Sequence, residues 1–259
     1  MNDHSHSAAS ILDQIVIVLY QPRDVVNIGG VVRAMKNMGL RRLRLVEPVP
    51  FASEDILRIA RRSDDLLATL QIYPDLDAAL ADTTYVVGAS EHHHAEHPAR
   101  SDIRALALAL LQRSAGGPVA LLFGPEDNGL SKRELDRCYT IVRLPTDPDY
   151  PSLNLAQAAL LLMYELRMAA GAGGLVHALE TPKPHVPPHD QAACVADLET
   201  FFTTAEQALQ VIGFFKTGSA TKTLRALRQL IHRAEPSQRE VALLTAMARE
   251  IIKFFQRQR

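Results

Sequence analysis

The sequence predicts an α/β fold with a largely parallel β-sheet, followed by a small helical extension. Between residues 15 and 166, short runs of β-branched and apolar residues alternate with stretches of helical periodicity, a pattern typical of βαβ units. The runs are apolar throughout, as expected for strands buried on both faces of a sheet. A chain of 259 residues that is 47% hydrophobic is long enough to bury such a core.

Six strands are expected in the first part of the chain, the third of them weak. They cover residues 15–19, 43–46, 71–73, 85–88, 119–123 and 140–144. Helices are expected between the strands, where apolar residues recur at helical spacing. They cover residues 29–38, 53–62, 101–113 and 153–170. This alternation predicts one domain at residues 13–170, preceded by a flexible polar start at residues 1–12.

A linker is predicted at residues 171–190, where three glycines precede four prolines that fall within seven positions. Beyond it, residues 194–215, 220–233 and 237–257 show amphipathic helical patterning, with Pro236 at an N-terminal turn. Residues 191–259 therefore predict a helical C-terminal extension.

Charge is distributed unevenly along the chain. Residues 216–259 hold ten lysines and arginines against three acidic residues, a local charge of +7, while the whole chain carries −1. This asymmetry suggests a polyanionic partner for the C-terminal extension, although a solvated basic helix face would give the same pattern.

Cysteine usage and hydropathy limit the function classes. Cys138 and Cys194 lie far apart and outside metal-ligand spacing, so neither a disulfide framework nor a metal site is expected, and a reducing cytoplasmic location fits. The start of the chain is polar, and the apolar run at residues 15–20 is too short to cross a bilayer. A soluble protein without a membrane partner is therefore expected.

Three segments with polar residues and glycines follow predicted strands, the position at which open α/β sheets bind ligands. The first, residues 27–34, offers Asn27 as a helix cap, two glycines that permit close approach of a backbone or substrate, and Arg33 on the first or second helical turn. It lacks the dinucleotide fingerprint G-x-G-x-x-G, which disfavours an oxidoreductase. Taken alone, it is explained better as a glycine-bearing turn with a surface arginine.

The second and third segments carry further candidate ligand groups. Residues 121–131 combine two glycines, a proline and polar residues in a shaped loop, with Ser131 as a helix N-cap; an ordinary βα loop is the alternative. Residues 144–156 contain three prolines and two aspartates before Ser152, Asn154 and a hydrophobic helix. The amide donors at a helix start form a natural ligand site, although Ser152 would also serve as a plain cap.

In this order, the three segments resemble the motifs N-x-G…R, F-G-x-E…G-L and P-x…S-L-N-x-A of the SpoU branch of the SPOUT RNA methyltransferases. Residues 180–182, 211–214, 224–230 and 233–234 resemble the C-terminal extension of one subgroup, the TrmJ tRNA 2′-O-methyltransferases. The resemblance implies a SPOUT fold with a trefoil knot in the methyltransferase domain, a homodimer, S-adenosylmethionine as methyl donor, and tRNA or another structured RNA as substrate.

The resemblance also implies roles for individual residues. The catalytic set would be Arg33 at the reacting ribose, Asn27 and Glu126 in support of it, and Ser152 and Asn154. The methyl donor would be held by Ala89, Ser90, Gly124, Leu144, Ser152, Leu153 and Asn154. Arginine is often assigned as the base in such enzymes, but a guanidinium that stays protonated is a poor proton acceptor. Arg33 is therefore expected to bind the adjacent phosphate and stabilise developing alkoxide charge, and base action would require a site that perturbs it strongly.

Basic residues elsewhere are candidates for RNA contact. The set comprises Arg33, Arg41, Arg42, Lys132, Arg133, Arg225 and Arg228, with Arg44 beside Arg42 on the same expected surface. Surface solubility would account equally well for Arg41, Arg42, Arg44, Lys132 and Arg133.

Residues 91–97 depart from the family pattern. Glu-His-His-His-Ala-Glu-His stands where the TrmJ subgroup usually carries arginines, expected near positions 92 and 94. Consecutive histidines rarely converge on one metal ion, so a solvated loop is expected. Mostly neutral imidazoles in place of arginines would weaken RNA binding at pH 7 and make it pH-dependent.

This departure leaves the target RNA open. The leading interpretation is 2′-O-methylation of cytidine or uridine at nucleotide 32 of the tRNA anticodon loop. The alternatives are another tRNA position, ribosomal RNA, or a non-catalytic RNA-binding protein of the same fold.

Overall fold

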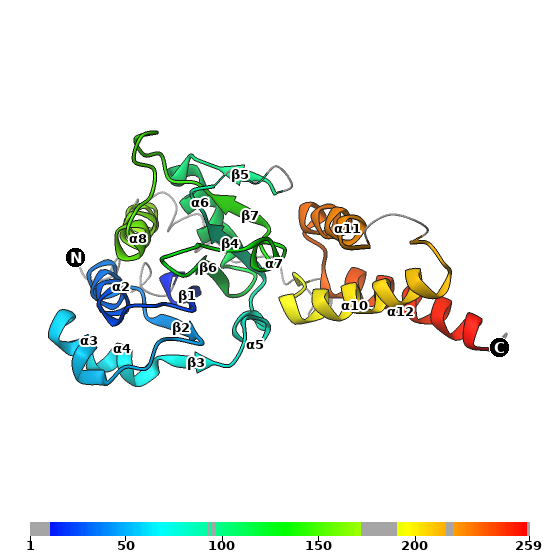
Figure 1. Ribbon diagram of the computed structural model, residues 1–259, viewed down its shortest axis with the longest axis horizontal. Coiled ribbons are helices and arrows are strands. Elements are labelled where there is room, and N and C mark those ends of the chain that lie inside the picture. The colour runs from blue at the N-terminus through cyan, green and yellow to red at the C-terminus, as the bar shows by residue number, and fades with distance from the viewer. Residues whose placement is uncertain (1–10, 93, 95–96, 172–190, 216–219, 258–259) are drawn as a thin grey trace. The chain divides into compact units, whose positions relative to one another are not determined.

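The computed structural model describes residues 11–92, 94, 97–171, 191–215 and 220–257. The chain divides into two compact units, Met1–Lys183 and Pro184–Arg259 (Figure 1). Residues 1–10 of the expected flexible start and residues 172–190 of the expected linker lie outside the described residues. None of the helices described is long and apolar enough to cross a membrane.

The first unit is built on a seven-stranded sheet in which every strand pairing is parallel (Figure 1). The strands are β1 (Ile15–Tyr20), β2 (Arg42–Val46), β3 (Gln71–Tyr73), β4 (Tyr85–Ala89), β5 (Ala99–Arg100), β6 (Val119–Phe123) and β7 (Thr140–Val142). Their order across the sheet is β3-β2-β1-β6-β4-β7-β5. The predicted α/β class with a largely parallel sheet is therefore confirmed. The edge strand β5 is absent from the prediction because two exposed residues carry no hydrophobic pattern.

Helices follow most of the strands. They are α2 (Val25–Met38), α3 (Ser53–Ile59), α4 (Asp64–Thr69), α5 (Leu76–Leu80), α6 (Ile103–Arg113), α7 (Lys132–Leu135) and α8 (Leu155–Gly171). α8 packs against both α2 and α6. The short helices α4 and α5 are missing from the prediction because neither is long enough to show a helical period.

Helix α2 begins four residues before the predicted start at residue 29. Asp24 is its N-cap, and the Asp24 carboxylate accepts a hydrogen bond from the Val26 amide at 2.8 Å. The expected capping role of Asn27 is therefore wrong, because a capping carboxylate lies three residues upstream.

The two glycines of α2 let other helices approach closely. A Cβ atom added to Gly30 would lie 2.8 Å from the Cβ of Ala156 in α8, and one added to Gly29 would lie 2.8 Å from the Cδ1 of Ile59 in α3. The close approach predicted from the glycines is thus made by neighbouring helices of the same unit.

Arg44 is a buried arginine in β2 rather than part of the basic surface expected from the sequence. Its guanidinium donates to the two carboxylate oxygens of Asp82 at 2.6 and 2.8 Å and to the carbonyl of Ala79 at 2.6 Å. It also lies 5.6 Å from the ring centroid of Tyr73. These hydrogen bonds from Arg44 lower the pKa of the Asp82 carboxyl below its usual value. The interaction ties β2 to β3 and to the segment after α5.

Replacing Asp82 with Asn is expected to destabilise the first unit because Arg44 would keep a buried charge without its ionic partner. The expected loss is about 1–3 kcal/mol, less than for a fully buried pair, because half of the Asp82 side chain is exposed. Urea unfolding of the Asp82→Asn variant and the parent protein measures this difference. Asp65→Asn, at an exposed ion pair with Lys36, is the matched control and should cost less.

The Asp82 contribution should also depend on pH. Because the folded pKa lies below the unfolded value of about 3.9, the contribution is fully present above that value and is lost as pH falls through the folded pKa. The stability difference between parent and Asp82→Asn should therefore stay constant near neutrality and shrink in acid. A difference that grows in acid would contradict this assignment.

The described part of the second unit contains helices α10 (Val195–Val211), α11 (Ala220–Ala234) and α12 (Gln238–Arg257), which match the three predicted helices closely. α12 packs along α10, and an antiparallel bridge joins Ala192 to Ser237. Arg228 of α11 forms a bidentate ion pair with Glu199 of α10, and its guanidinium lies 4.2 Å from the ring centroid of Phe202. These contacts attach α11 to α10.

Candidate active site

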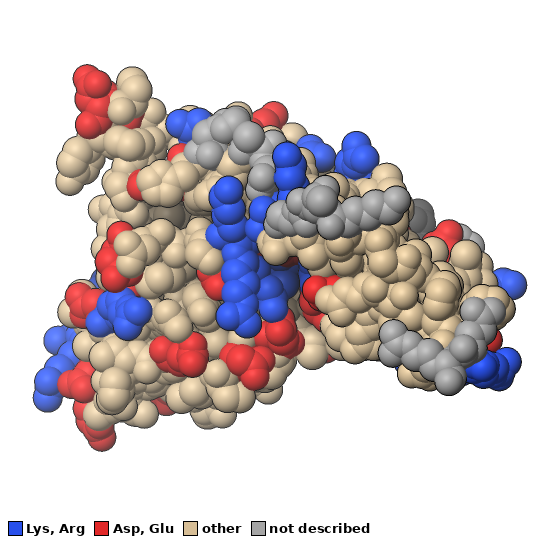
Figure 2. All heavy atoms as spheres, turned by 45° about the vertical axis from the view of Figure 1, so that its right-hand side comes forward, with Lys and Arg blue, Asp and Glu red and all other residues tan. Residues whose placement is uncertain are grey.

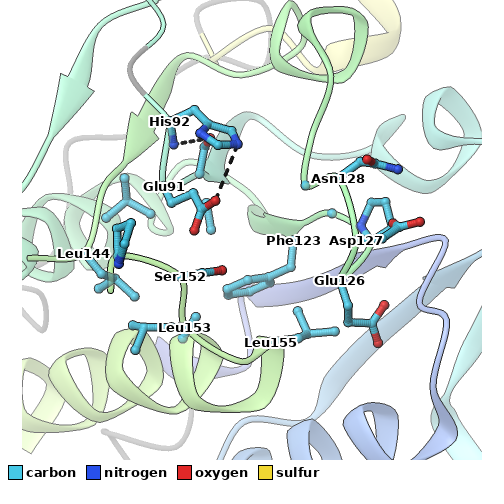
Figure 3. A pocket seen from close by; sticks show the side chains of 18 residues that line it. Glu91, His92, Phe123, Glu126, Asp127, Asn128, Leu144, Ser152, Leu153 and Leu155 are labelled. Atoms are coloured by element: carbon cyan, nitrogen blue, oxygen red, sulfur yellow. Dashed lines mark hydrogen bonds and ion pairs between the residues drawn. The ribbon is translucent and has the colours of Figure 1, made fainter. Parts of the chain in front are cut away.

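A pocket lies at the carboxyl ends of β4, β6 and β7 (Figure 3). Its lining comes from the loops that follow these strands and from the start of α8, within residues 89–92, 123–129 and 142–158. The three strands are neighbours in a parallel sheet, so their following loops meet at one edge. The second and third polar segments of the sequence therefore come together in space, although they are separated along the chain.

Most residues predicted to hold a methyl donor line this pocket. The lining includes Ala89, Ser90, Gly124, Leu144, Ser152 and Leu153. Asn154 is not part of it: its side-chain amide donates to the Asn27 Oδ1 at 2.7 Å, and its Oδ1 accepts from the Ala156 amide at 2.9 Å. Asn154 therefore caps the start of α8, the role that the sequence left open for Ser152.

The loop after β6 is folded tightly on itself. A Cβ atom added to Gly124 would lie 2.5 Å from the carbonyl carbon of Gly129, so only glycine fits there without a shift of the loop. The loop ends at Ser131, whose hydroxyl accepts from the Arg133 amide at 3.2 Å while Glu134 accepts from the Ser131 amide at 2.8 Å. The predicted N-cap at Ser131 is confirmed.

A chain of hydrogen bonds joins the three motif segments. The Glu126 carboxylate accepts from the side-chain amide of Asn27 at 2.7 Å and from the backbone amides of Arg23 and Asp24 at 2.8 and 3.3 Å. Asn27 in turn accepts from Asn154 at 2.7 Å. Glu126 thus fixes the entry to α2, and Asn27 connects that entry to the start of α8.

Arg33 lies apart from these groups. Because α2 begins at Val25, Arg33 is on the third helical turn, and the expected position on the first or second turn is wrong. Its side chain is exposed, and its guanidinium donates to the carbonyl of Ile59 at 3.3 Å. Arg33 is not among the residues that line the pocket.

The lining of the pocket is mostly apolar and includes acidic residues. Glu91 directs its carboxylate into the cavity, whereas the carboxylates of Glu126 and Asp127 point away from it (Figure 3), and the described lining holds no lysine or arginine. Carboxylates without a neighbouring cation favour a positively charged ligand. The sequence prediction missed Glu91, His92 and Asp127, because only their positions just after strands point to them.

Part of the histidine-rich loop is buried, whereas the sequence predicts a solvated loop. The His97 side chain is 1% exposed, and its Nε2 lies 3.1 Å from the Asp136 carboxylate. The His94 Nε2 lies 3.1 Å from the Ser90 hydroxyl, which also accepts from the His92 amide at 3.3 Å. The expectation fails at His97 because packing against α7 and its C-terminal turn buries this ring, which sequence spacing does not reveal.

His93, Ala95 and Glu96 of this loop lie outside the described residues. In the portion of the chain that the structure describes, no group of three or more histidine, cysteine or acidic side chains is arranged to hold a metal ion. Cys138 and Cys194 are both free thiols.

The predicted RNA-binding residues fall into two groups. Arg41, Lys132 and Arg133 are exposed, whereas Arg42 is one-third exposed and pairs with Asp82 at 3.3 Å. In the second unit, Arg225 and Arg228 are half-buried on α11, and Arg228 is engaged with Glu199 and Phe202. Figure 2 shows a contiguous column of basic side chains on the face drawn, with acidic side chains below it and to its sides.

Comparisons with known proteins agree with the fold and the motifs. Residues 14–164 match the model of the SpoU rRNA Methylase family, and residues 196–259 match the C-terminal domain of the tRNA methyltransferase TrmJ. The chain is 36% identical over 243 residues to the tRNA (cytidine/uridine-2'-O-)-methyltransferase TrmJ of Klebsiella pneumoniae, covering 93% of this chain and 97% of the relative. The TrmJ of Escherichia coli K12 is also 36% identical, over 245 residues, with 93% and 96% covered.

Solved structures extend the likeness to three dimensions. The crystal structure of TrmJ from Z. mobilis ZM4 has a TM-score of 0.75 at 27% identity, covering 91% of this chain and 98% of that one. A probable methylase family protein from Haemophilus influenzae Rd KW20 has a TM-score of 0.59 at 30% identity, covering 96% and 100%. Together with the parallel sheet and the three motif loops, these matches establish that the chain belongs to the SpoU methylase family.

Proposed function

We propose that the protein transfers a methyl group from S-adenosylmethionine to a ribose 2′-hydroxyl of tRNA. The observation that carries this proposal is the pocket assembled from the motif loops, in a chain similar over nearly its whole length to tRNA (cytidine/uridine-2'-O-)-methyltransferases. We further propose that the target is nucleotide 32 of the anticodon loop. We also propose that the segments around the pocket form a trefoil knot and that the protein is located in the cytoplasm.

The pocket suits the proposed methyl donor chemically. S-adenosylmethionine carries positive charge on its sulfonium and ammonium groups, which the Glu91 carboxylate directed into the cavity would favour. Phe123, Leu144 and other apolar side chains of the lining would contact its adenine ring. The donor supplies an already activated methyl group, so this chain mainly has to orient the reactants, a contribution of about 7 kcal/mol or more in well-aligned systems.

The motif residues divide between binding and positioning. Arg33 would bind an RNA phosphate and stabilise negative charge that develops on the ribose oxygen. Glu126, Asn27 and Asn154 would act as positioning residues, because their hydrogen bonds fix the starts of α2 and α8. Ser152 lines the pocket beside the proposed donor. No step requires a metal ion.

Replacing Arg33 with Ala should reduce methyl transfer by roughly 10²–10³-fold, the usual effect of losing one charge-stabilising donor. The assay incubates the protein with labelled methyl donor and total tRNA or rRNA, and then maps the 2′-O-methyl group. Donor affinity, measured by calorimetry, should stay unchanged, and Arg58→Ala is the control at another exposed arginine. Label in rRNA alone, or donor binding without transfer, would contradict the tRNA assignment.

We also propose that the protein works as a homodimer. Leu161, Tyr164 and Met168 form one exposed apolar stripe along α8, with 42%, 47% and 53% of each residue accessible. A clustered stripe of this kind favours an interface over scattered surface exposure. A second copy of the chain would cover it, and the partner chain would bring its arginine toward this pocket, which Arg33 of the same chain does not line.

The double variant Leu161→Glu with Met168→Glu should convert the dimer to a monomer, because charged side chains would be buried without partners in the proposed interface. Sedimentation velocity at micromolar concentration measures the change. Ile72→Glu, at an equally exposed apolar residue on β3, is the matched control and should remain dimeric. A monomeric parent protein would contradict the proposed interface.

We propose that exposed basic residues of the first unit, Arg41, Lys132 and Arg133, contact the RNA backbone. The double variant Lys132→Ala with Arg133→Ala should raise the tRNA dissociation constant by roughly tenfold, about 1.4 kcal/mol for two phosphate contacts. Filter binding of the full-length protein measures it, with Arg58→Ala as the control. An unchanged dissociation constant would remove this surface from the proposed RNA interface.

A further inference from the structure

Glu91 and His92 form a carboxylate–imidazole pair at the rim of the pocket. The His92 Nε2 lies 3.4 Å from the Glu91 Oε1, and both residues line the pocket. Figure 3 draws the Glu91 carboxylate directed into the cavity above Ser152, with His92 at the rim beside it. The His92 side chain is 65% exposed, so an RNA substrate can reach it.

The proposed reaction needs a proton acceptor that the motif residues do not provide. A ribose 2′-hydroxyl must lose its proton when its oxygen takes the methyl group, and the Arg33 guanidinium is a poor base. Ser152 and Asn128 of the lining are neutral groups that do not take up a proton readily. His92 is the imidazole in the described lining, and histidine is the side chain that most often serves as a general base.

We propose that His92, oriented by Glu91, accepts the proton of the ribose 2′-hydroxyl. This inference rests on the proposed methyl-transfer function. As the ribose oxygen bonds to the methyl carbon, the methyl–sulfur bond breaks and its electron pair stays on sulfur. The hydroxyl proton passes to the Nδ1 of His92, whose Nε2–H donates to Glu91. The imidazolium then returns the proton to water.

The structure holds the rim in place through several neighbouring contacts. The Ser90 hydroxyl accepts from the His92 amide at 3.3 Å and lies 3.1 Å from the His94 Nε2, which shapes the turn. The buried pair of His97 and Asp136 fixes the other end of the loop.

The charged groups that face His92 favour the imidazolium formed in this step. Glu91 is the contacting carboxylate, and the His94 ring centroid lies 6.4 Å from that of His92. Glu126 and Asp127 lie on the loop after β6 across the cavity, and Figure 3 shows their carboxylates directed away from His92. Glu91 is therefore the carboxylate placed to stabilise the positive charge that forms on His92 during the step.

The test measures single-turnover methyl transfer to tRNA for the full-length parent, His92→Gln and Glu91→Gln. The pH is varied from about 5.5 to about 8.5, the range in which histidine side chains generally titrate. The parent rate should rise with pH through one inflection and then level off. His92→Gln should be slower by about 10²–10⁴-fold at high pH and lose the inflection. Glu91→Gln should be intermediate. Arg33→Ala is the matched control: it should be slow but keep the inflection.

A second measurement does not depend on activity. NMR titration of the isotope-labelled histidines should show one imidazole, absent from His92→Gln, whose midpoint matches the kinetic inflection. If His92→Gln keeps the parent rate and pH profile, the inference is overturned while the methyl-transfer function stands. A variant that only raises the tRNA dissociation constant and keeps the inflection also overturns it, because His92 would then be a phosphate contact. No transfer by the parent protein overturns both proposals.

Discussion

The site depends on the carboxylate of Glu126, because this one group joins segments that lie about a hundred residues apart. It accepts hydrogen bonds from Arg23, Asp24 and Asn27, and Asn27 passes the connection on to Asn154 at the start of α8. Each bond is solvent-exposed and adds little to the free energy of unfolding. Their joint effect is geometric: the N-termini of α2 and α8 and the loop after β6 hold one fixed arrangement at the sheet edge, and the pocket forms beside it.

Much of the fold follows from local pattern. The strand at residues 15–19 is predictable because every residue is apolar, and the structure buries all of them completely. The start of α2 is harder, since Asp24 and Asn27 are both good capping residues and only packing decides between them. Gly30 illustrates a further limit: glycine is required there because Ala156, in a helix more than a hundred residues later, occupies the space that a side chain would fill. Contacts of that kind have no local signature.

The residues of the candidate site likewise divide into those that the sequence indicates and those that only tertiary contacts place. The resemblance to the family indicates Ser90, Gly124 and Ser152, which the fold brings to one pocket. No motif indicates Glu91 or His92, since their position beside the pocket depends on how the loop after β4 turns at Ser90. The burial of His97 has the same cause, because the ring packs against a turn that lies about forty residues downstream. Residues in irregular loops are placed by tertiary contacts, and a single sequence does not contain those contacts in readable form.

Ion pairs inside the second unit change the meaning of the +7 charge that residues 216–259 carry. Arg228 is neutralised by Glu199, and Lys253 pairs with the Glu250 carboxylate at 2.6 Å. A polyanion gains affinity from a protein mainly by releasing condensed counterions, roughly one for each phosphate that a basic group neutralises. Basic side chains that are already paired with carboxylates release few counterions when a nucleic acid binds. The effective valence of this unit toward a nucleic acid is therefore smaller than its count of lysines and arginines, and the charge of Arg228 serves to hold α11 on α10.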